Sequence, residues 1–375
     1  MSRIANTVRR TSEGLLLGAG LLALASCGGD GSGLGPGDGD DEFAGLKLDC
    51  QLASNLLADG GPGPEGIYAL TEPKFVEPGS PELSYLRDDD RVVGLIVNGD
   101  VRAYPHNIFW WHELVNDVVG GRPVAISFCP LTGSAVAIDP VINGRRVEFG
   151  ISGLLFANNL VMFDRETDEV YGPQLFIEGR CNAFKGIEPS MIEVAEMTWG
   201  RWKELHPETK VLSGETSFNR PYTQYPYGSY DQLTNNSLLF PMSVDNSRPI
   251  KERVLGIRVG DTGGKAYPFG ELENLGPVSV VNDVVGGDAI VIFYEAANRK
   301  SAHAFHRTVG GQTLTFEVVD GQYRDVETGS TWDLAGRAVG GPMTGEQLDR
   351  VDTAYTVFWF AWRHFQPDAA TFQAS

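Results

Sequence analysis

Short apolar runs separated by glycine-containing turns follow one another along most of the chain, a pattern typical of β-rich proteins. Two such runs, 92–97 and 101–104, flank Asn98-Gly99-Asp100, and an Asn-Gly turn between apolar runs predicts a β-hairpin. The segments 107–115 and 192–205 instead have the apolar spacing of helices. We therefore expect an α+β fold, rich in β-structure, whose short strands are mostly antiparallel.

The pattern occurs twice. Residues 91–206 are matched in order by residues 253–366, and Val-Asn-Asp-Val-Val-Gly-Gly stands unaltered at 115–121 and at 281–287. Shorter matches keep nearly the same offset: Arg91-Val92-Val93-Gly94 with Arg253-Val254-Leu255-Gly256, Ala103-Tyr104-Pro105 with Ala266-Tyr267-Pro268, and Trp199/Trp202 with Trp359/Trp362. This order predicts two tandem pseudo-repeats packed as one unit. Residues that both copies share are expected to be scaffold, and residues found in one copy are candidates for chemistry.

The start of the chain predicts an export signal and a tether. The apolar run 14–25 follows a basic start and is too short to span a bilayer, and Leu24-Ala25-Ser26-Cys27 has the form of a lipobox. We expect a signal peptide over 1–27 with lipid on Cys27, then a flexible Gly/Asp-rich tether over 28–45. The rest divides into a first half-unit over 46–210, a Tyr/Pro-rich connector over 211–252 and a second, degenerate half-unit over 253–375.

The net charge of the chain and its expected export signal limit the kinds of partner that the protein can bind. The formal net charge of −19 argues against nucleic acid and anionic membrane surfaces. The expected partners are the lipid bilayer, through the Cys27 anchor, and a protein or glycan ligand. We expect the protein in the cell envelope, outside the cytoplasm. The outer membrane or cell surface is favoured over the inner membrane, because Gly28-Gly29 after Cys27 does not suggest inner-membrane retention.

Three cysteines remain besides Cys27: Cys50, Cys129 and Cys181. An odd number leaves at least one thiol outside any pair, while an oxidising compartment favours one disulfide. The sequence does not select the pair.

Several motifs of the first copy and the connector stand out together. They are Trp111-His112-Glu113-Leu114-Val115-Asn116-Asp117, Gly121-Arg122-Pro123-Val124-Ala125, Cys129-Pro130-Leu131, Phe149-Gly150-Ile151-Ser152-Gly153 and Pro226-Tyr227-Gly228-Ser229-Tyr230. They resemble a bacterial family, the domain-of-unknown-function family 3179, over most of residues 85–300. The resemblance implies no settled activity. Members typically have a second cysteine where Thr132 stands, so neither a dithiol pair nor a two-thiolate metal site is available at this loop.

The two copies differ in chemistry-bearing residues. Counted from the shared heptamer, His112 stands opposite Val278, Glu113 opposite Ser279 and Cys129 opposite Glu295. The first copy alone therefore carries a histidine, a glutamate and a cysteine near a helix end and a strand end, where binding groups often lie. Asp117 is retained in both copies and is better explained by local backbone bonding, although we keep it among the candidates.

Three interpretations of this centre compete. A cysteine-dependent enzyme for acyl transfer or hydrolysis would use Cys129 as nucleophile and His112 as base, with Glu113 or Asp117 orienting the imidazole. A copper or zinc site would use His112 and Cys129 as ligands, although their spacing does not recur in metal sites.

In the third interpretation, Cys129 is a buried or disulfide-bonded residue and His112 a core histidine, and the protein is a ligand-binding or scaffolding module. We favour this one, keep the other two open, and find no cofactor firmly implied.

A second candidate surface lies in the connector, which contains Tyr222, Tyr225, Tyr227 and Tyr230. Exposed, these rings would stack on a sugar or peptide; buried, they would form the seam between the half-units, which we favour. Asp245, Arg248 and Lys251 near its end have the pattern of surface ion-pair residues.

Overall fold

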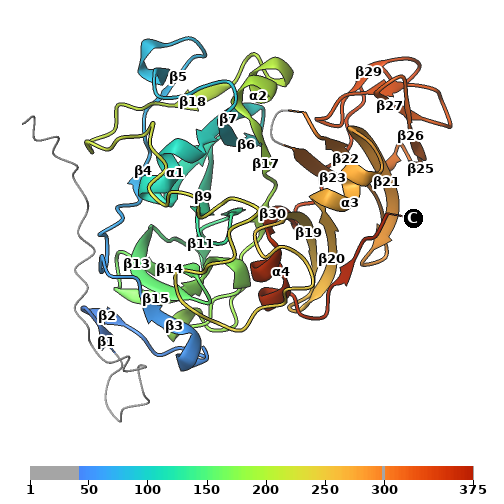
Figure 1. Ribbon diagram of the computed structural model, residues 1–375. Coiled ribbons are helices and arrows are strands. Elements are labelled where there is room, and N and C mark those ends of the chain that lie inside the picture. The colour runs from blue at the N-terminus through green and yellow to red at the C-terminus, as the bar shows by residue number, and fades with distance from the viewer. Residues whose placement is uncertain (1–41, 298–299, 375) are drawn as a thin grey trace, which may run out of the picture.

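Figure 1 shows the computed structural model of the protein, which describes residues 42–297 and 300–374. The expected signal peptide, Cys27 and tether residues 28–41 lie outside this range. The end of the tether segment forms a short hairpin, in which β1 (Glu42–Phe43) pairs with β2 (Leu46–Lys47). Within the described residues, no helix is long and apolar enough to cross a membrane.

The expected β-rich α+β fold is confirmed, because the chain forms several sheets of short and mostly antiparallel strands. The helices are short: α1 (His106–His112), α2 (Trp199–Leu205), α3 (Phe269–Asn274) and α4 (Trp359–Phe365). Four 3-10 turns add to them, at Ser54–Leu56, Pro81–Leu83, Gln174–Phe176 and Asn182–Phe184.

Three main sheets and a small hairpin make up the N-terminal half. The first has the order β17 (Ala195–Thr198), β6 (Arg91–Val97), β7 (Asp100–Pro105), β18 (Lys210–Leu212), β5 (Phe75–Val76). The second has the order β16 (Met191–Ile192), β10 (Ser134–Ile138), β9 (Arg122–Cys129), β8 (Leu114–Val119), β4 (Leu70–Thr71). The third has the order β1, β2, β15 (Glu169–Pro173), β14 (Asn159–Asp164), β13 (Phe149–Phe156), β3 (Leu57–Asp59), and β11 (Val141–Ile142) pairs with β12 (Arg145–Arg146).

Among the described residues, the C-terminal half also contains three sheets and a small hairpin, with fewer strands in each sheet. Its first sheet has the order β30 (Ala354–Phe358), β19 (Arg253–Val259), β20 (Gly263–Pro268), β31 (Ala370–Thr371), and its second β21 (Val278–Val285), β22 (Asp288–Glu295), β23 (Ser301–His306). The third has the order β26 (Phe316–Val319), β27 (Gln322–Asp325), β28 (Thr331–Trp332), β29 (Ala338–Gly340), and β24 (Thr308–Val309) pairs with β25 (Gln312–Thr313).

Glycine and tryptophan pack in the same way in both halves. A Cβ at Gly94 would lie 2.1 Å from the Trp202 ring, and one at Gly256 would lie 2.1 Å from the Trp362 ring. The indole ring of each helix therefore packs directly against the glycine of the neighbouring strand, and any larger residue at that position would clash with the ring. These four residues are among those that the two sequence copies share.

The helical pattern expected over 192–205 is wrong in its first part. Residues 195–198 form strand β17, and the helix begins only at Trp199. The segment 107–115 ends its helix at His112 and enters β8 at Leu114. In both cases a short buried strand directly adjoins a short helix, and its apolar residues continue the apolar spacing of the helix, so the pattern does not mark the boundary between them.

The two halves share a core. Leu131 and Phe149 of the first half cluster with Val254 and Phe358 of the second. The connector, yellow in Figure 1, runs over the region where the halves meet and contains no helix or strand between β18 and β19.

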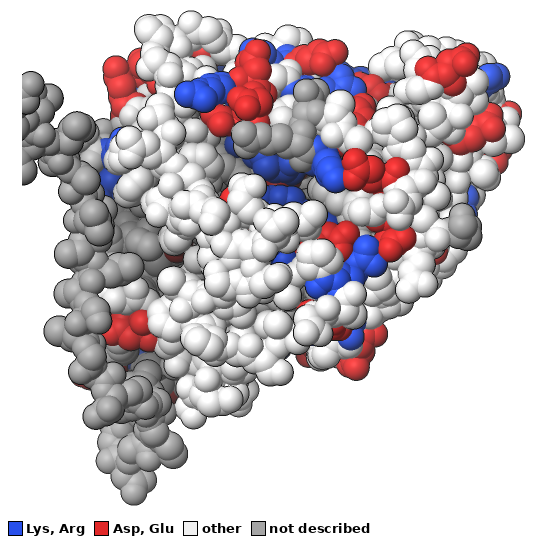
Figure 2. Space-filling view, in the orientation of Figure 1, with Lys and Arg blue, Asp and Glu red and all other residues white. Residues whose placement is uncertain are grey.

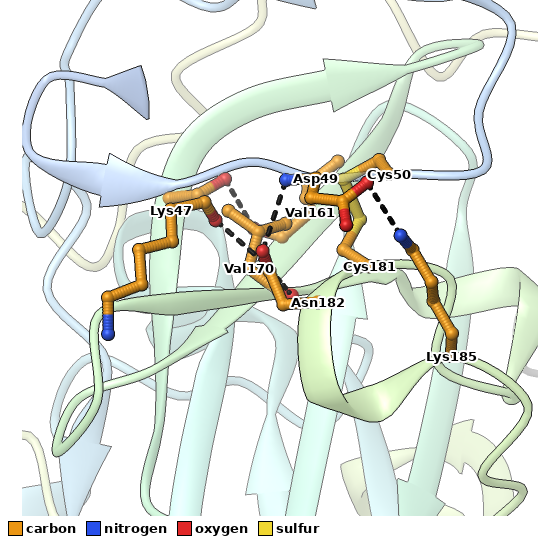
Figure 3. Close-up of a disulfide and its surroundings, with 9 residues drawn as sticks. Lys47, Asp49, Cys50, Val161, Val170, Cys181, Asn182 and Lys185 are labelled. Atoms are coloured by element: carbon orange, nitrogen blue, oxygen red, sulfur yellow. Dashed lines mark hydrogen bonds and ion pairs between the residues drawn. A yellow bond between two sulfur atoms is a disulfide. The ribbon is translucent and has the colours of Figure 1, made fainter. Parts of the chain in front are cut away.

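A disulfide closes the N-terminal segment onto the first half. Cys50 bonds to Cys181, and Cys129 is left as a free, buried thiol. Around the disulfide, the Asn182 amide donates to the carbonyl of Lys47 (2.8 Å), and Lys185 pairs with Asp49 at 2.6 Å (Figure 3). The bridge joins residues 131 positions apart, so it closes a long loop and lowers the conformational entropy of the unfolded chain.

The double substitution Cys50→Ser/Cys181→Ser should lower the free energy of unfolding by about 2–5 kcal/mol. Denaturant unfolding measures this loss, and reduction of the wild-type disulfide should reproduce it. Reductant should not affect the stability of the double variant. Equal stability of oxidised wild type and variant would contradict the pairing, as would a Cys129-containing bridge found by peptide mapping.

Candidate functional site

Glu113 follows helix α1 in an unusual backbone conformation. Its φ of 57° lies in the left-handed region, where glycine is the usual residue after a helix. The turn is held at both ends, because the Glu113 N–H donates to the Phe109 carbonyl (2.8 Å) and the Glu113 carbonyl accepts from the Phe128 N–H (2.7 Å). Such a conformation costs about 1–2 kcal/mol for a residue with a Cβ. The turn buries the Glu113 side chain beside the end of β9.

Burial raises the pKa of Glu113 to about 8, and a hydrogen bond with the Tyr227 hydroxyl acts in the opposite direction. The carboxyl group is therefore largely protonated at neutral pH and is able to donate a proton. Such shifted carboxyl groups are frequent at functional sites.

His112 is held away from Cys129. Its Nδ1 lies 2.7 Å from the carbonyl of Tyr68, and its Nε2 lies 2.7 Å from the Tyr222 hydroxyl. Burial lowers the pKa of His112 to about 4, so the ring is neutral: Nδ1–H donates to the carbonyl and Nε2 accepts from the hydroxyl. Both ring nitrogens are used, and neither is left to take a proton from a thiol.

Cys129 ends strand β9 with 0% of its surface exposed, and its thiol donates to the carbonyl of Asn158 at 3.6 Å. Burial raises the pKa of the thiol to about 11, and the nearby Glu113 carboxylate raises it further. The exposed, easily ionised thiol that a nucleophile requires is not found here. Across the described ranges, no group of three or more His, Cys, Asp and Glu side chains is placed to hold a metal ion.

Asp117 belongs to the scaffold of the first half. In β8 it accepts from Arg102 (2.7 Å) and Tyr104 (2.6 Å), and in β21 Asp283 accepts from Lys265 (2.6 Å) and Tyr267 (2.8 Å). Asn116 and Asn282 likewise bond Phe149 and Phe316 on a neighbouring strand. These residues therefore tie strands together in both halves. The local backbone bonding expected of Asp117 is also present, because its Oδ1 accepts from the Val118 N–H at 2.7 Å.

The connector tyrosines cover the centre. Tyr222 bonds His112, Tyr227 bonds Glu113, and the Tyr230 hydroxyl donates to the carbonyl of Leu131 (3.1 Å). Tyr225 packs its ring edge-on against Trp110, 5.1 Å between centroids. All four are buried or half-buried, and the partners named here belong to the first half. The two candidate sets that the sequence kept apart therefore form one site.

The loop between β9 and β10 is held by a buried network of side-chain hydrogen bonds. The Thr132 hydroxyl accepts from Asn159 (3.1 Å) and lies 2.8 Å from that of Ser134, which donates to Gln174 (2.8 Å). All four side chains are buried. The position where the family typically has a second cysteine is thus part of a satisfied hydrogen-bond network.

A small cavity lies next to this loop and is lined in part by its Pro130 and Gly133, and no sequence motif indicated it directly. Its volume is about 30 Å³, and its lining includes Arg91, His106, Tyr225, Asp231 and Arg253. The cavity is thus formed by both halves and the connector. In Figure 2, lysine and arginine atoms lie in a hollow at the middle of the visible face.

Two arginines approach one buried carboxylate beside the cavity. Arg91 Nε donates to Glu196 at 2.8 Å, and Arg253 Nη1 donates to the same oxygen at 3.4 Å. Arg91 begins β6 and Arg253 begins β19, which are matching positions of the two sequence copies. That match was the one signal in the sequence that could have identified them.

Lys251 corrects another expectation. It is not a surface ion-pair residue, since only 2% of it is exposed and its Nζ has no hydrogen-bond partner among the described residues. The ammonium group lies 3.1 Å from the centroid of the Tyr230 ring and 5.0 Å from that of Phe360. Burial lowers the pKa of Lys251 to about 7, while Cys129 and Asp231 act in the opposite direction.

The profile of a family described as "Protein of unknown function (DUF3179)" matches residues 64–369. The chain belongs to this family. The match includes the centre, the connector and both halves, and it confirms the resemblance seen in the sequence. No curated protein and no solved structure matches the chain.

The variant Glu113→Gln tests, through the pH dependence of protein stability, whether Glu113 is buried as a neutral acid. The folded-state pKa of Glu113, about 8, lies above its ordinary value of 4.5, so the stability from burying the neutral acid is complete below pH 4.5 and is lost as pH rises to 8. The amide cannot ionise. The variant should therefore gain stability relative to wild type, by up to about 1.4 kcal/mol per pH unit in this window.

Denaturant unfolding at pH 5, 6, 7 and 8 measures the difference. Glu317→Gln, at an exposed position of β26, is the matched control and should follow wild type at every pH. Parallel pH profiles for wild type and Glu113→Gln would show that Glu113 is ionised and solvated in the native protein.

Proposed function

We propose that the protein is a ligand-binding module that takes a small oxyanion, such as a carboxylate, into the cavity between its two halves. The Tyr225 hydroxyl carries this proposal. It is buried in the lining of the cavity and has no hydrogen-bond partner among the described residues. A buried polar group without a partner is rare in native proteins and indicates a missing water or ligand.

Arg253 supplies a second donor. A guanidinium group has five N–H donors, and the hydrogen bond from Nη1 to Glu196 engages one of them. Its side chain keeps 20% of its surface exposed and lines the same cavity. A guanidinium and a hydroxyl that face one space favour a ligand with oxygen acceptors and negative charge.

The charge around the cavity permits such a ligand. Arg91 and Arg253 both pair with the buried carboxylate of Glu196, and Lys251 Nζ lies 5.6 Å from the centroid of the Phe358 ring. Asp231, which is half-buried, is the acidic residue in the lining. The volume of about 30 Å³ suits a ligand of a few heavy atoms, because one water needs ~10–15 Å³ on this measure.

The ligand-binding interpretation is favoured over the two alternatives by the contacts of Cys129 and His112. The thiol is fully buried and carries a raised pKa, and both nitrogens of the imidazole are engaged elsewhere. A catalytic pair or a metal site at these residues would need a rearrangement of the connector.

Thermal unfolding in formate, acetate and nitrate at constant ionic strength tests the proposal. We expect stabilisation that saturates with Kd between about 0.1 and 10 mM, the range that suits ligands of this size. Tyr225→Phe removes only the unpartnered hydroxyl and should weaken binding roughly fivefold without loss of stability, and Arg253→Met should weaken it at least about tenfold.

Tyr68→Phe, at an exposed tyrosine, is the matched control and should bind as wild type does. Equal stabilisation of all four proteins would be a general salt effect and would overturn the proposal.

We further propose that this module is held outside the cytoplasm by a lipid on Cys27. The sequence pattern ending at Cys27 and the Cys50–Cys181 disulfide support this location, because disulfides persist in oxidising compartments. In a bacterial host, the wild-type protein should be recovered with membranes, and its mature N-terminal peptide should carry the mass of the lipid. Cys27→Ala should lose both properties, and membrane association of that variant equal to wild type would contradict the anchor.

A further inference from the structure

The amine of Lys251 is the one buried cation of this centre that no carboxylate or carbonyl holds among the described residues. Lysine loses hydration when buried and normally recovers it through hydrogen bonds or an ion pair. Here the rings of Tyr230, Phe358 and Phe360 surround Nζ at centroid distances of 3.1, 5.6 and 5.0 Å. Aromatic faces hold an ammonium group by cation–π attraction, and they also suit a neutral amine.

Lys251 lies next to the proposed anion cavity. Its Nζ and the Arg253 guanidinium pack against the same ring, Phe358, at 5.6 and 5.1 Å from the centroid. Phe358 and Asp231 both line the cavity, and Asp231 also acts on the charge of Lys251. The unpartnered amine and the guanidinium that lines the cavity therefore lie against the same aromatic ring.

We propose that Lys251 forms an imine with a small oxo acid, whose carboxylate is held by Arg253 and whose carbonyl meets the amine. This inference rests on the proposed anion site and names the class of its ligand. A neutral, desolvated lysine is the usual nucleophile for such condensations. Because burial lowers the pKa of Lys251 to about 7, a large part of the amine is unprotonated at neutral pH.

The chemistry balances without any other reactant. The nitrogen lone pair of Lys251 adds to the carbonyl carbon, a carbon–nitrogen double bond forms, and the carbonyl oxygen leaves as water with the two amine protons. Asp231, whose charge acts on Lys251, lines the cavity and would carry these protons to the leaving oxygen. The resulting imine keeps the ligand carboxylate beside Arg253.

A ligand reaches the amine when the connector shifts. Tyr230 and Asp231 belong to this segment, which has no helix or strand between β18 and β19. Long segments without regular structure that cover a site are often functional lids, and they open at a lower free energy than the sheets. The same opening would admit oxo acids larger than the closed cavity.

Reductive trapping tests the inference. The mature chain is incubated with glyoxylate, pyruvate or 4-oxobutanoate, which differ in the spacing between carbonyl and carboxylate, and sodium cyanoborohydride reduces any imine to a stable amine. Intact-mass and peptide mass spectrometry should find one adduct per chain, on Lys251, for at least one of the three acids. The trapping rate should rise as pH passes 7, and acetate should compete.

Variants separate the possible outcomes. Lys251→Met should abolish the adduct, and Arg253→Met, which keeps the lysine, should slow trapping roughly tenfold. Lys210→Met, at an exposed end of β18, should leave it unchanged. Circular dichroism establishes that each variant is folded.

The failures of the two proposals are distinguishable. Acetate stabilisation without a Lys251 adduct would overturn the imine and leave the anion site standing. An adduct that acetate and Arg253→Met do not affect would overturn the oxo-acid class, and labelling spread over surface lysines would overturn the special reactivity of Lys251.

Discussion

The structure depends on the complete burial of the loop between β9 and β10, because each of its polar backbone groups must find a partner inside the protein. The carbonyl of Thr132 accepts from the N–H of Phe358 in the second half (2.8 Å), and the carbonyl of Leu131 accepts from the Tyr230 hydroxyl of the connector (3.1 Å). Gly133 has φ 61° and lies against the Phe358 ring, so no side chain fits there. The requirement to satisfy this loop thus brings both halves and the connector to one point.

The chemistry of the centre follows from the same burial. Water is excluded from Glu113, Cys129 and Lys251, and the ionised form of each is disfavoured, so the pKa values of the two acids rise to about 8 and 11 and that of the amine falls to about 7. Glu113 and Cys129 therefore carry little charge at neutral pH and Lys251 is only partly protonated, which lets the three groups lie close together without strong ion pairs. Arg91 and Arg253 both donate to Glu196. Arg91 and Arg253 therefore line the cavity, while Glu113, Cys129 and Lys251 are buried behind its lining.

The sequence predicted the fold class and the family, because both depend on local patterns: apolar alternation, Asn-Gly turns and contiguous motifs. It also brought forward Glu113 and Cys129, which do lie together, by contrast between the copies. The ring nitrogens of His112 contact the Tyr68 carbonyl and the Tyr222 hydroxyl, and these partners come from distant parts of the chain that no local pattern brings together. Lys251 stands beside Arg248 and Asp245 in a polar stretch, and only the tertiary fold brings Tyr230 over its amine. Arg91 and Arg253 match between the copies, but a shared position was taken as scaffold, and their meeting at Glu196 depends on how the halves pack.

The most direct test of the account is the structure of crystals of the mature protein grown with acetate, compared with crystals grown without it. The account predicts density for one carboxylate in the cavity, with its oxygens about 3 Å from the guanidinium of Arg253 and the hydroxyl of Tyr225. A cavity that holds only water in both crystals, or one filled by a side chain, would contradict the proposal that the halves and the connector enclose an anion site.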